Sequence, residues 1–323
     1  MKNSHYLLAL HTIDGLGPVR LKNLLDHFKD PTLIWEANVR EIREVGVPEG
    51  VVNLLVETRK ELDPDQMILD LEKMGIKWMT IFDKEYPKLL AQIYDPPIVF
   101  YYKGEFSPHD EKAIAVVGTR RITGYGKMVT EKFVTGFVAS GLTIVSGLAR
   151  GVDACAHKTA IDNNGRTIAV LGGGLNKIFP PENTKLADEI ASGFGVVISE
   201  FPPDHLSVAG NFPVRNRIIS GLSIGVLVTE AASDSGSLIT ARLALEQGRD
   251  VFAVPGPITS DLSRGPADLI KEGARLVMEA VEILEELGLD QVKSFKFKVK
   301  NLKELEEDEL KILDLLENEQ KHI

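Results

Sequence analysis

Short apolar runs alternate with amphipathic segments along residues 113–287. Residues 113–117 are continuously apolar, which is typical of a strand buried on both faces in a parallel sheet. The next apolar positions share one face of a helix and are Met128, Val129, Phe133, Phe137 and Val138. Further strands are predicted at residues 143–146, 167–171, 196–199, 224–229 and 251–254, and further helices at 152–163, 183–192, 215–222, 238–247, 267–272 and 280–287. This alternation predicts an α/β domain with a doubly wound, mostly parallel sheet.

The N-terminal part of the chain has the pattern of a small all-helical domain. Pro18 suits the first turn of a helix that turns its leucines inward. The glycine turn before Pro18 and a weaker copy at residues 46–48 resemble a SAM or helix-hairpin-helix arrangement, in which turn amides can bind DNA phosphate. We favour the alternative of an interaction domain with tight helical turns, because a lone Gly-x-Gly is weak evidence.

Changes in pattern and composition divide the chain into four parts. A helical accessory domain covers residues 1–66, and a connector with two strands, at 76–82 and 98–102, covers 67–110. The α/β domain is predicted at 111–288. Residues 289–323 are predicted to form a linker and one acidic amphipathic helix.

The formal net charge of −10 by itself argues against nucleic-acid binding. The charge is uneven, however, because residues 301–323 hold eight acidic residues and three lysines, whereas residues 113–217 hold eleven Lys or Arg and eight Asp or Glu. A local basic surface is therefore compatible with the composition, as are scattered, solvated arginines. The single cysteine and the lack of an apolar span or secretory pattern indicate a cytoplasmic protein without membrane contact.

Four glycine-rich segments each follow a predicted strand, at residues 118–126, 147–151, 172–174 and 235–237. Strand ends of a doubly wound sheet gather at one edge, where glycine backbone and helix N-termini favour an anion. We therefore predict that this edge binds nucleic-acid backbone. The candidates in these segments are Gly118, Thr119, Arg120, Arg121, Thr123, Gly124, Tyr125, Gly126, Gly147, Arg150, Gly173, Gly174, Ser235, Gly236 and Ser237.

Other ligands fit these segments poorly. The first loop, GTRRITGYG, lacks the Gly-x-Gly-x-x-Gly of dinucleotide sites, and Met128 replaces the hydroxyl residue of a phosphate-binding P-loop. No His-Glu-x-x-His or Cys/His set indicates a metal. We expect neither metal nor cofactor.

A second basic cluster, Phe212 to Arg217, places an aromatic ring before Arg215, Asn216 and Arg217. Single-strand binders combine cations for phosphate with a ring on which a base stacks. The alternative is that Phe212 belongs to the core and one arginine is buried against Glu200 or Glu230. We weigh the two equally for Arg217 and expect Arg215 to remain accessible, since long cations rarely bury unpaired.

One helix offers the only candidates for acid–base chemistry. Asp153 and His157 are four residues apart, so they can pair on one helical face. We favour a structural pair over an acid/base pair. Asp153 is also expected to brace the loop at residues 147–151.

Six ordered motifs resemble the DNA-processing protein A (DprA/Smf) family: GTRRITGYG, SGLARGVDACAH, SEFPP, FPVRNRIISGLS, SGSLITA and VFAVPG. The resemblance implies a Rossmann-like domain that binds and protects single-stranded DNA, forms a homodimer and helps load the RecA recombinase in natural transformation, without catalysis. It places Arg120, the backbone of residues 118–126 and Arg215 on phosphate. It also implies that Lys177 and Phe179 line the groove and that Phe212 stacks a base. The C-terminal helix resembles the start of a winged-helix domain, which this chain would leave incomplete.

Two other functions remain open from the sequence. The fold also resembles nucleotide-monophosphate phosphoribohydrolases, which use a PGGxGTxxE loop, but the corresponding SGSLITA lacks the double glycine and the glutamate. The second alternative is an interaction module whose arginines form salt bridges only.

Overall fold

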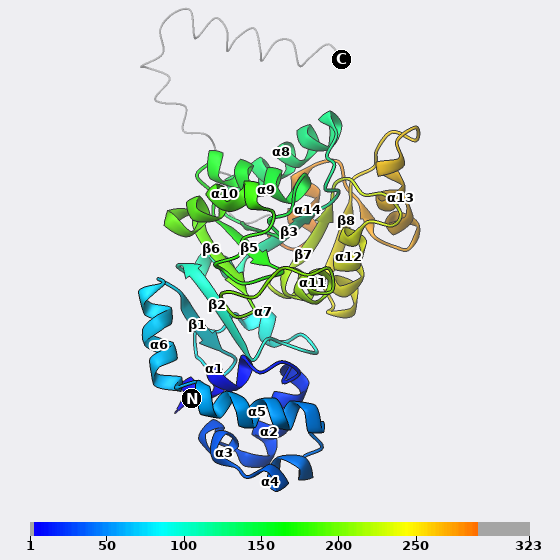
Figure 1. Ribbon diagram of the computed structural model, residues 1–323. Helices are drawn as coiled ribbons and strands as arrows, with labels where there is room; N and C mark the ends of the chain where they lie inside the picture. The colour runs from blue at the N-terminus through cyan, green and yellow to red at the C-terminus, as the bar shows by residue number, and fades with distance from the viewer. Residues whose placement is uncertain (1–2, 290–323) are drawn as a thin grey trace, which may run out of the picture.

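The computed structural model describes residues 3–289, which form an α/β body with a group of N-terminal helices at one end (Figure 1). The predicted linker and acidic helix at the C-terminus lie outside the described residues. The strands are β1 Lys77–Thr80, β2 Val99–Gly104, β3 Ala113–Val117, β4 Thr143–Ser146, β5 Thr167–Leu171, β6 Gly195–Ser199, β7 Gly225–Val228, β8 Asp250–Ala253 and β9 Arg275–Leu276.

Helices precede and alternate with these strands. They are α1 Ser4–His11, α2 Pro18–Phe28, α3 Pro31–Glu36, α4 Val39–Glu44, α5 Glu49–Glu61, α6 Pro64–Lys73, α7 Lys88–Ala91, α8 Gly124–Ala139, α9 Val152–Asp162, α10 Thr184–Glu189, α11 Asn211–Gly221, α12 Gly236–Glu246, α13 Arg264–Lys271 and α14 Ala280–Glu286. Short 3-10 turns occur at Pro108–Glu111, Pro181–Asn183 and Asp261–Ser263, and a π-turn at Ile190–Phe194 extends α10. No helix among residues 3–289 is both long and apolar enough to span a bilayer.

The strands form one sheet in the order β1-β2-β6-β5-β4-β3-β7-β8-β9. Strands β3 to β9 pair in parallel. Strand β2 pairs antiparallel with β6, and β1 pairs antiparallel with β2. This arrangement confirms the doubly wound, mostly parallel α/β fold. The strand order reverses between β3 and β7, and this switch point is where such sheets bind ligands.

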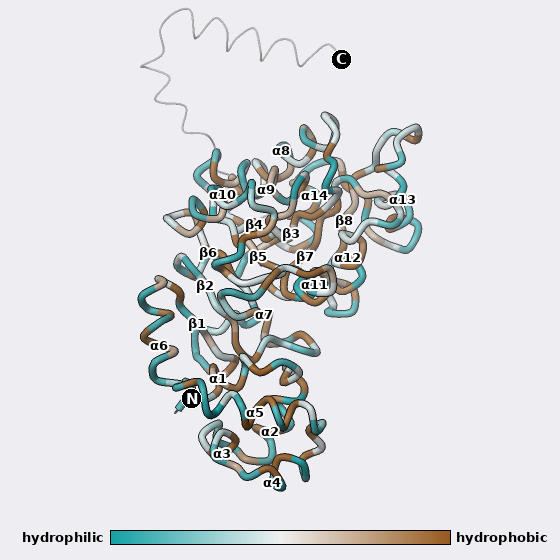
Figure 2. Tube along the Cα trace, in the orientation of Figure 1, coloured by the Kyte–Doolittle hydropathy of each residue, from teal (hydrophilic) through white to brown (hydrophobic). Residues whose placement is uncertain are grey.

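Both faces of the sheet are covered, which explains why its strands read as continuous apolar runs. In β3, Ala113, Ala115 and Val117 pack in the core under α11, α12 and α13, while Ile114 and Val116 pack in the core under α8, α9 and α14. Figure 2 shows the resulting hydrophobic colour along the central strands. The alternation of side chains along a strand therefore divides one apolar run between two cores.

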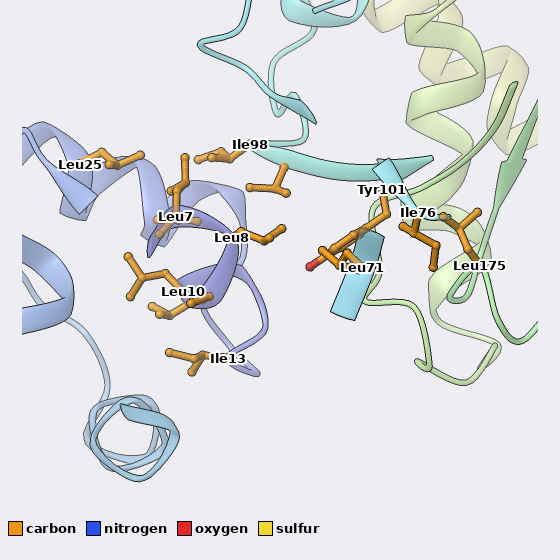
Figure 3. Close-up of a cluster of buried hydrophobic side chains, with 14 of the residues drawn as sticks. Leu7, Leu8, Leu10, Ile13, Leu25, Leu71, Ile76, Ile98, Tyr101 and Leu175 are labelled. Carbon is orange, nitrogen blue, oxygen red and sulfur yellow. The ribbon is translucent and has the colours of Figure 1, made fainter. Parts of the chain in front are cut away.

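A third core joins the N-terminal helices to the sheet. Tyr101 of β2 lies between leucines of α1 and a group that includes Leu71 and Leu175 (Figure 3). Through β2, the predicted connector thus belongs to the same sheet as the α/β strands and carries the contact with α1.

Several element boundaries differ from the prediction. Helix α11 begins at Asn211 instead of residue 215, so Phe212 lies inside its first turn. Pro213 is tolerated there because first-turn amides have no helical partner to lose. Met128, predicted on the apolar face of α8, is 58% exposed. The short helices α3 and α7 and the two-residue strand β9 carry too few positions to show a period.

We predict that Tyr101→Phe leaves the free energy of unfolding unchanged or raises it by about 1 kcal/mol, because the buried Tyr101 hydroxyl has no hydrogen-bond partner among the described residues. Tyr86→Phe is the matched control. It removes a buried hydroxyl that donates to the Pro97 carbonyl at 2.8 Å and should cost about 1 kcal/mol. Urea unfolding measures both, and a large loss in Tyr101→Phe would contradict the assignment.

Candidate nucleic-acid interface

A cavity of about 520 Å³ lies at the carboxyl ends of β3 and β7. Most of its lining comes from three segments far apart in the sequence: the loop after β3, the first turns of α11 and the start of α12. The predicted site residues among the lining are Gly118, Thr119, Arg120, Arg121, Phe212, Arg215, Asn216, Ser235, Gly236 and Ser237. The topological switch point thus brings together parts of three of the four predicted glycine-rich segments and the cluster that begins at Phe212.

Sequence reasoning missed part of the lining. Ala209, Pro213, Ile219, Ala232, Asp234, Ile239 and Thr240 also face the cavity, together with Asp153. Ile219 follows Phe212 and Arg215 at helical spacing, and Ile239 and Thr240 follow Gly236 in the same way. The helical period, applied from the predicted site residues, would have found these positions.

The N-terminus of α8 is occupied by the protein's own carboxylate, contrary to the expectation of a phosphate there. Glu230 accepts hydrogen bonds from the Thr123 amide, at 3.0 Å, and from its hydroxyl, at 2.6 Å. Thr123 Oγ1 in turn accepts from the Gly126 amide at 3.0 Å. A side chain at Gly126 would collide with the Glu230 carboxylate. The second half of the first glycine loop is therefore closed, and Thr123, Gly124, Tyr125 and Gly126 do not line the cavity.

The N-terminus of α12 faces the cavity instead. Ser235 is its N-cap, and the Ser235 side chain accepts a hydrogen bond from the Ser237 amide at 3.4 Å. Asn216 of α11 donates to the Gly236 carbonyl at 3.3 Å, which joins two walls of the cavity. The positive end of this helix dipole is thus directed at the cavity. The exposed Asp234 lies beside it and adds an opposing charge.

The first half of the loop after β3 supplies free cations. Arg120 and Arg121 are exposed, and neither guanidinium forms an ion pair or hydrogen bond within residues 3–289. The Arg120 guanidinium lies 5.1 Å from the centroid of the Phe212 ring, a cation–π distance. Half-buried Phe212 rests against Gly172, where an added Cβ would come within 2.9 Å of the ring. Exposed Phe179 has its ring centre 6.1 Å away.

Arg215 is buried, which corrects the expectation that it would remain accessible. Only 4% of Arg215 is exposed, and its Nη1 donates to the carbonyls of Gly147, at 2.5 Å, and Val170. Burial lowers the pKa of Arg215 to about 10, so the side chain stays protonated at neutral pH. Its Nε has no hydrogen-bond partner among the described residues. Arg215 therefore brings a positive charge to the cavity wall from inside the protein.

Arg217 is also buried and does not line the cavity. It forms a two-bond ion pair with Glu200, at 2.7 and 2.8 Å, which agrees with the alternative interpretation from the sequence. Its Nε donates to the Asp95 carboxylate at 2.9 Å. Each nitrogen of the Arg217 guanidinium thus has at least one protein acceptor.

The remaining glycines allow close packing of the protein on itself. Gly147 lies against the Arg215 guanidinium, Gly173 against Ser207, and Gly174 against the carbonyls of Pro202 and Pro203. Any side chain there would collide with these neighbours. Close backbone approach explains these glycines without a ligand.

Three exposed candidates lie outside the cavity lining. Arg150 forms an ion pair with Glu182. Exposed Lys177 and Phe179 follow the glycine turn after β5. Of these three residues, only Phe179 has an aromatic contact with a residue of the cavity lining, the ring of Phe212.

Asp153 and His157 do not pair, so the predicted structural pair is wrong. Asp153 accepts from the amides of Gly147, at 3.1 Å, and Ala149, at 3.4 Å, and so braces the loop as expected. His157 Nδ1 lies 2.6 Å from Thr167 Oγ1, whose hydroxyl donates to the Ile144 carbonyl. Nδ1 is therefore the protonated nitrogen, and Nε2 has no partner within the described residues.

Fold and site together define a Rossmann-like protein with a cationic, aromatic cavity at the switch point of its sheet. The model of the family "DNA recombination-mediator protein A" matches residues 77–288. The chain belongs to this family, whose relatives carry the names DprA and Smf.

Relatives and solved structures agree with this membership. The chain is 41% identical over 295 residues to protein Smf of Synechocystis, covering 89% of this chain and 74% of that protein. It is 46% identical over 216 residues to DprA of Bacillus subtilis, covering 67% and 72%. The crystal structure of DprA from Streptococcus pneumoniae matches 88% of this chain and 99% of that chain, with 37% identity and a TM-score of 0.78.

We predict a pH-dependent loss of stability from His157. Burial, with a smaller effect from Arg215, lowers its pKa to about 3, below the ordinary value of 6.5. Between these values the unfolded chain binds a proton that the folded protein excludes. His157 thus lowers the free energy of unfolding by about 1 kcal/mol for each pH unit below 6.5.

Urea unfolding of wild type and His157→Gln from pH 7 to pH 4 measures this contribution. The variant should lose less stability on acidification than wild type. The exposed His27→Gln is the control and should follow wild type. Parallel curves for wild type and His157→Gln would contradict the prediction.

Proposed function

We propose that this protein binds single-stranded DNA at the cavity between β3 and β7, as a non-catalytic mediator of recombination. The observation that carries the proposal is the pair of exposed guanidinium groups of Arg120 and Arg121, which form no ion pair or hydrogen bond within residues 3–289, beside the half-buried ring of Phe212. Cations that follow the backbone and a ring for base stacking are the features of single-strand sites.

Relatives support the choice of ligand. A solved structure of DNA processing protein A from Helicobacter pylori concerns that protein's single-stranded DNA binding mode. It is 31% identical to this chain, with a TM-score of 0.59, and covers 66% of it. The same ligand fits the charges and the ring of the cavity described here.

The expected mode of binding follows from the two kinds of contact. Phosphate attraction releases counterions, so the affinity should fall steeply with salt. Stacking on Phe212 accepts any base, so sequence preference should be weak. Duplex DNA keeps its bases stacked inside the helix and offers none to the ring.

Further parts of the proposal come from the family. We propose that the protein protects incoming DNA in the cytoplasm, helps load the RecA recombinase onto it during natural transformation, and acts as a homodimer. The non-catalytic part is supported by Asp153, the buried carboxylate of the cavity lining, which accepts hydrogen bonds from two loop amides. His157 lies outside the lining and is hydrogen-bonded to Thr167. Release of free base from a nucleoside monophosphate would contradict it.

Arg120→Ala is expected to weaken single-strand affinity about tenfold at 100 mM salt without lowering stability. The slope of log K against log[salt] should become shallower by about 0.7, the value for one phosphate contact on a single strand. Fluorescence anisotropy with labelled oligo-dT measures both. Arg264→Ala, an exposed arginine outside the cavity lining, is the control. An unchanged salt slope in Arg120→Ala would show that Arg120, and with it the loop after β3, does not contact phosphate.

Phe212→Leu is expected to weaken binding by about 1–3 kcal/mol, because it removes a stacking surface. The salt slope should stay the same, since no charge is lost. Phe212→Trp provides the control that restores an aromatic ring. Equal affinity of Leu and Trp variants would show that no base stacks on this residue.

A further inference from the structure

A buried ion cluster lies beneath α11, outside the lining of the cavity. Arg217 is 5% exposed and Glu200 is 6% exposed. Arg217 Nη1 and Nη2 donate to the two carboxylate oxygens of Glu200, and Nε donates to the Asp95 carboxylate and, at 3.1 Å, to its carbonyl. Each guanidinium nitrogen thus has an acceptor, and the planar group is fixed in orientation.

This cluster connects two distant segments to the first turns of α11. Glu200 directly follows β6, Asp95 belongs to the loop before β2, and Arg217 lies in α11. Arg217 Nη1 also donates to the Val214 carbonyl at 3.0 Å, one turn earlier in the helix. The rotation of α11 about its axis is therefore determined where it carries Phe212 and Arg215 to the cavity.

The cluster also contacts the N-terminal helices. His11, the last residue of α1, has its Nε2 2.6 Å from the Glu200 carbonyl oxygen. Burial lowers the pKa of His11, so the ring is neutral at neutral pH and Nε2–H is the donor. A single residue, Glu200, therefore bonds to α1 through its backbone and to α11 through its side chain.

We infer that Arg217 and Glu200 are positioning residues for the DNA site, and that His11 couples the N-terminal helices to it through Glu200. The inference rests on the proposed function and gives Arg217 a role in place of the direct DNA contact, which the sequence left equally open with a buried ion pair. The guanidinium acts through α11, by holding Phe212 and Arg215 against the cavity. The N-terminal helices thereby support single-strand binding without touching the strand.

Salt dependence separates positioning from direct contact. Arg217→Met removes one positive charge, and Arg217→Lys keeps the charge but loses the two-bond geometry. Positioning predicts that both variants bind oligo-dT about tenfold more weakly with the wild-type salt slope. A phosphate contact predicts instead that Lys retains affinity and that Met makes the slope shallower by about 0.7.

Glu200→Gln gives a second test, in which positioning and simple electrostatics predict opposite changes in affinity. It removes a negative charge near a polyanion, so simple electrostatics predicts tighter binding. Positioning predicts weaker binding, because the ion pair that orients α11 is lost. His11→Leu should give a smaller loss of affinity, again without a change of slope.

The matched control is Arg166→Met. Arg166 also forms a two-bond ion pair, with Asp110. It directly precedes β5 and thus lies at the amino end of that strand, whereas the cavity lies at the carboxyl ends of the strands. The Arg166→Met variant should bind oligo-dT like wild type.

Since Arg217→Met leaves Glu200 unpaired and threatens folding, the double variant Glu200→Leu/Arg217→Met provides a folded comparison. It should also bind weakly with an unchanged slope.

The outcomes distinguish this inference from the proposed function. Failure of wild type to bind oligo-dT overturns the proposed function. Hydrogen exchange at residues 211–217 then still tests positioning, which predicts faster exchange in Glu200→Gln than in Arg166→Met. Wild-type binding by Arg217→Lys and Glu200→Gln, or a shallower slope in Arg217→Met, overturns the inference.

Discussion

The parallel pairing of β3 with β7 determines where this protein has room for a ligand. The chain leaves β3 toward one side of the sheet and returns to β7 on the other, so the loops after these strands diverge. The space between them is the cavity, and α11 lines one side of it. Every candidate contact depends on this opening, because without it Arg120, Phe212 and Ser235 would have no common surface.

Two helix N-termini meet at this edge, and the protein uses them differently. The end of α8 is neutralised internally by Glu230, whereas the end of α12 is capped only by serines. A chain with a net charge of −10 thus keeps a small positive region by satisfying one dipole and leaving the other open. Buried Arg215 adds to this region a charge that solvent screens little.

The sequence predicted the sheet well because strands covered on both faces have an unmistakable apolar composition, as in residues 113–117. It also predicted which loops meet, since strand ends of a parallel sheet share an edge. It failed where the answer depends on packing. The burial of Arg215 against backbone carbonyls, the choice of Thr167 as partner of His157, and the insertion of Glu230 at α8 are all contacts between distant segments. Local patterns carry no record of such contacts.

The antiparallel attachment of β2 to β6 has a consequence for how the chain can be divided. A fragment that starts after residue 104 would lose both the N-terminal helices and the strand that covers β6. Its sheet would then end in an apolar, fully formed strand with unpaired amides and carbonyls, a template for association with other chains. Strand β2 therefore covers the open edge of β6, and a shortened version that begins before β1 keeps this cover, whereas one that begins before β3 loses it.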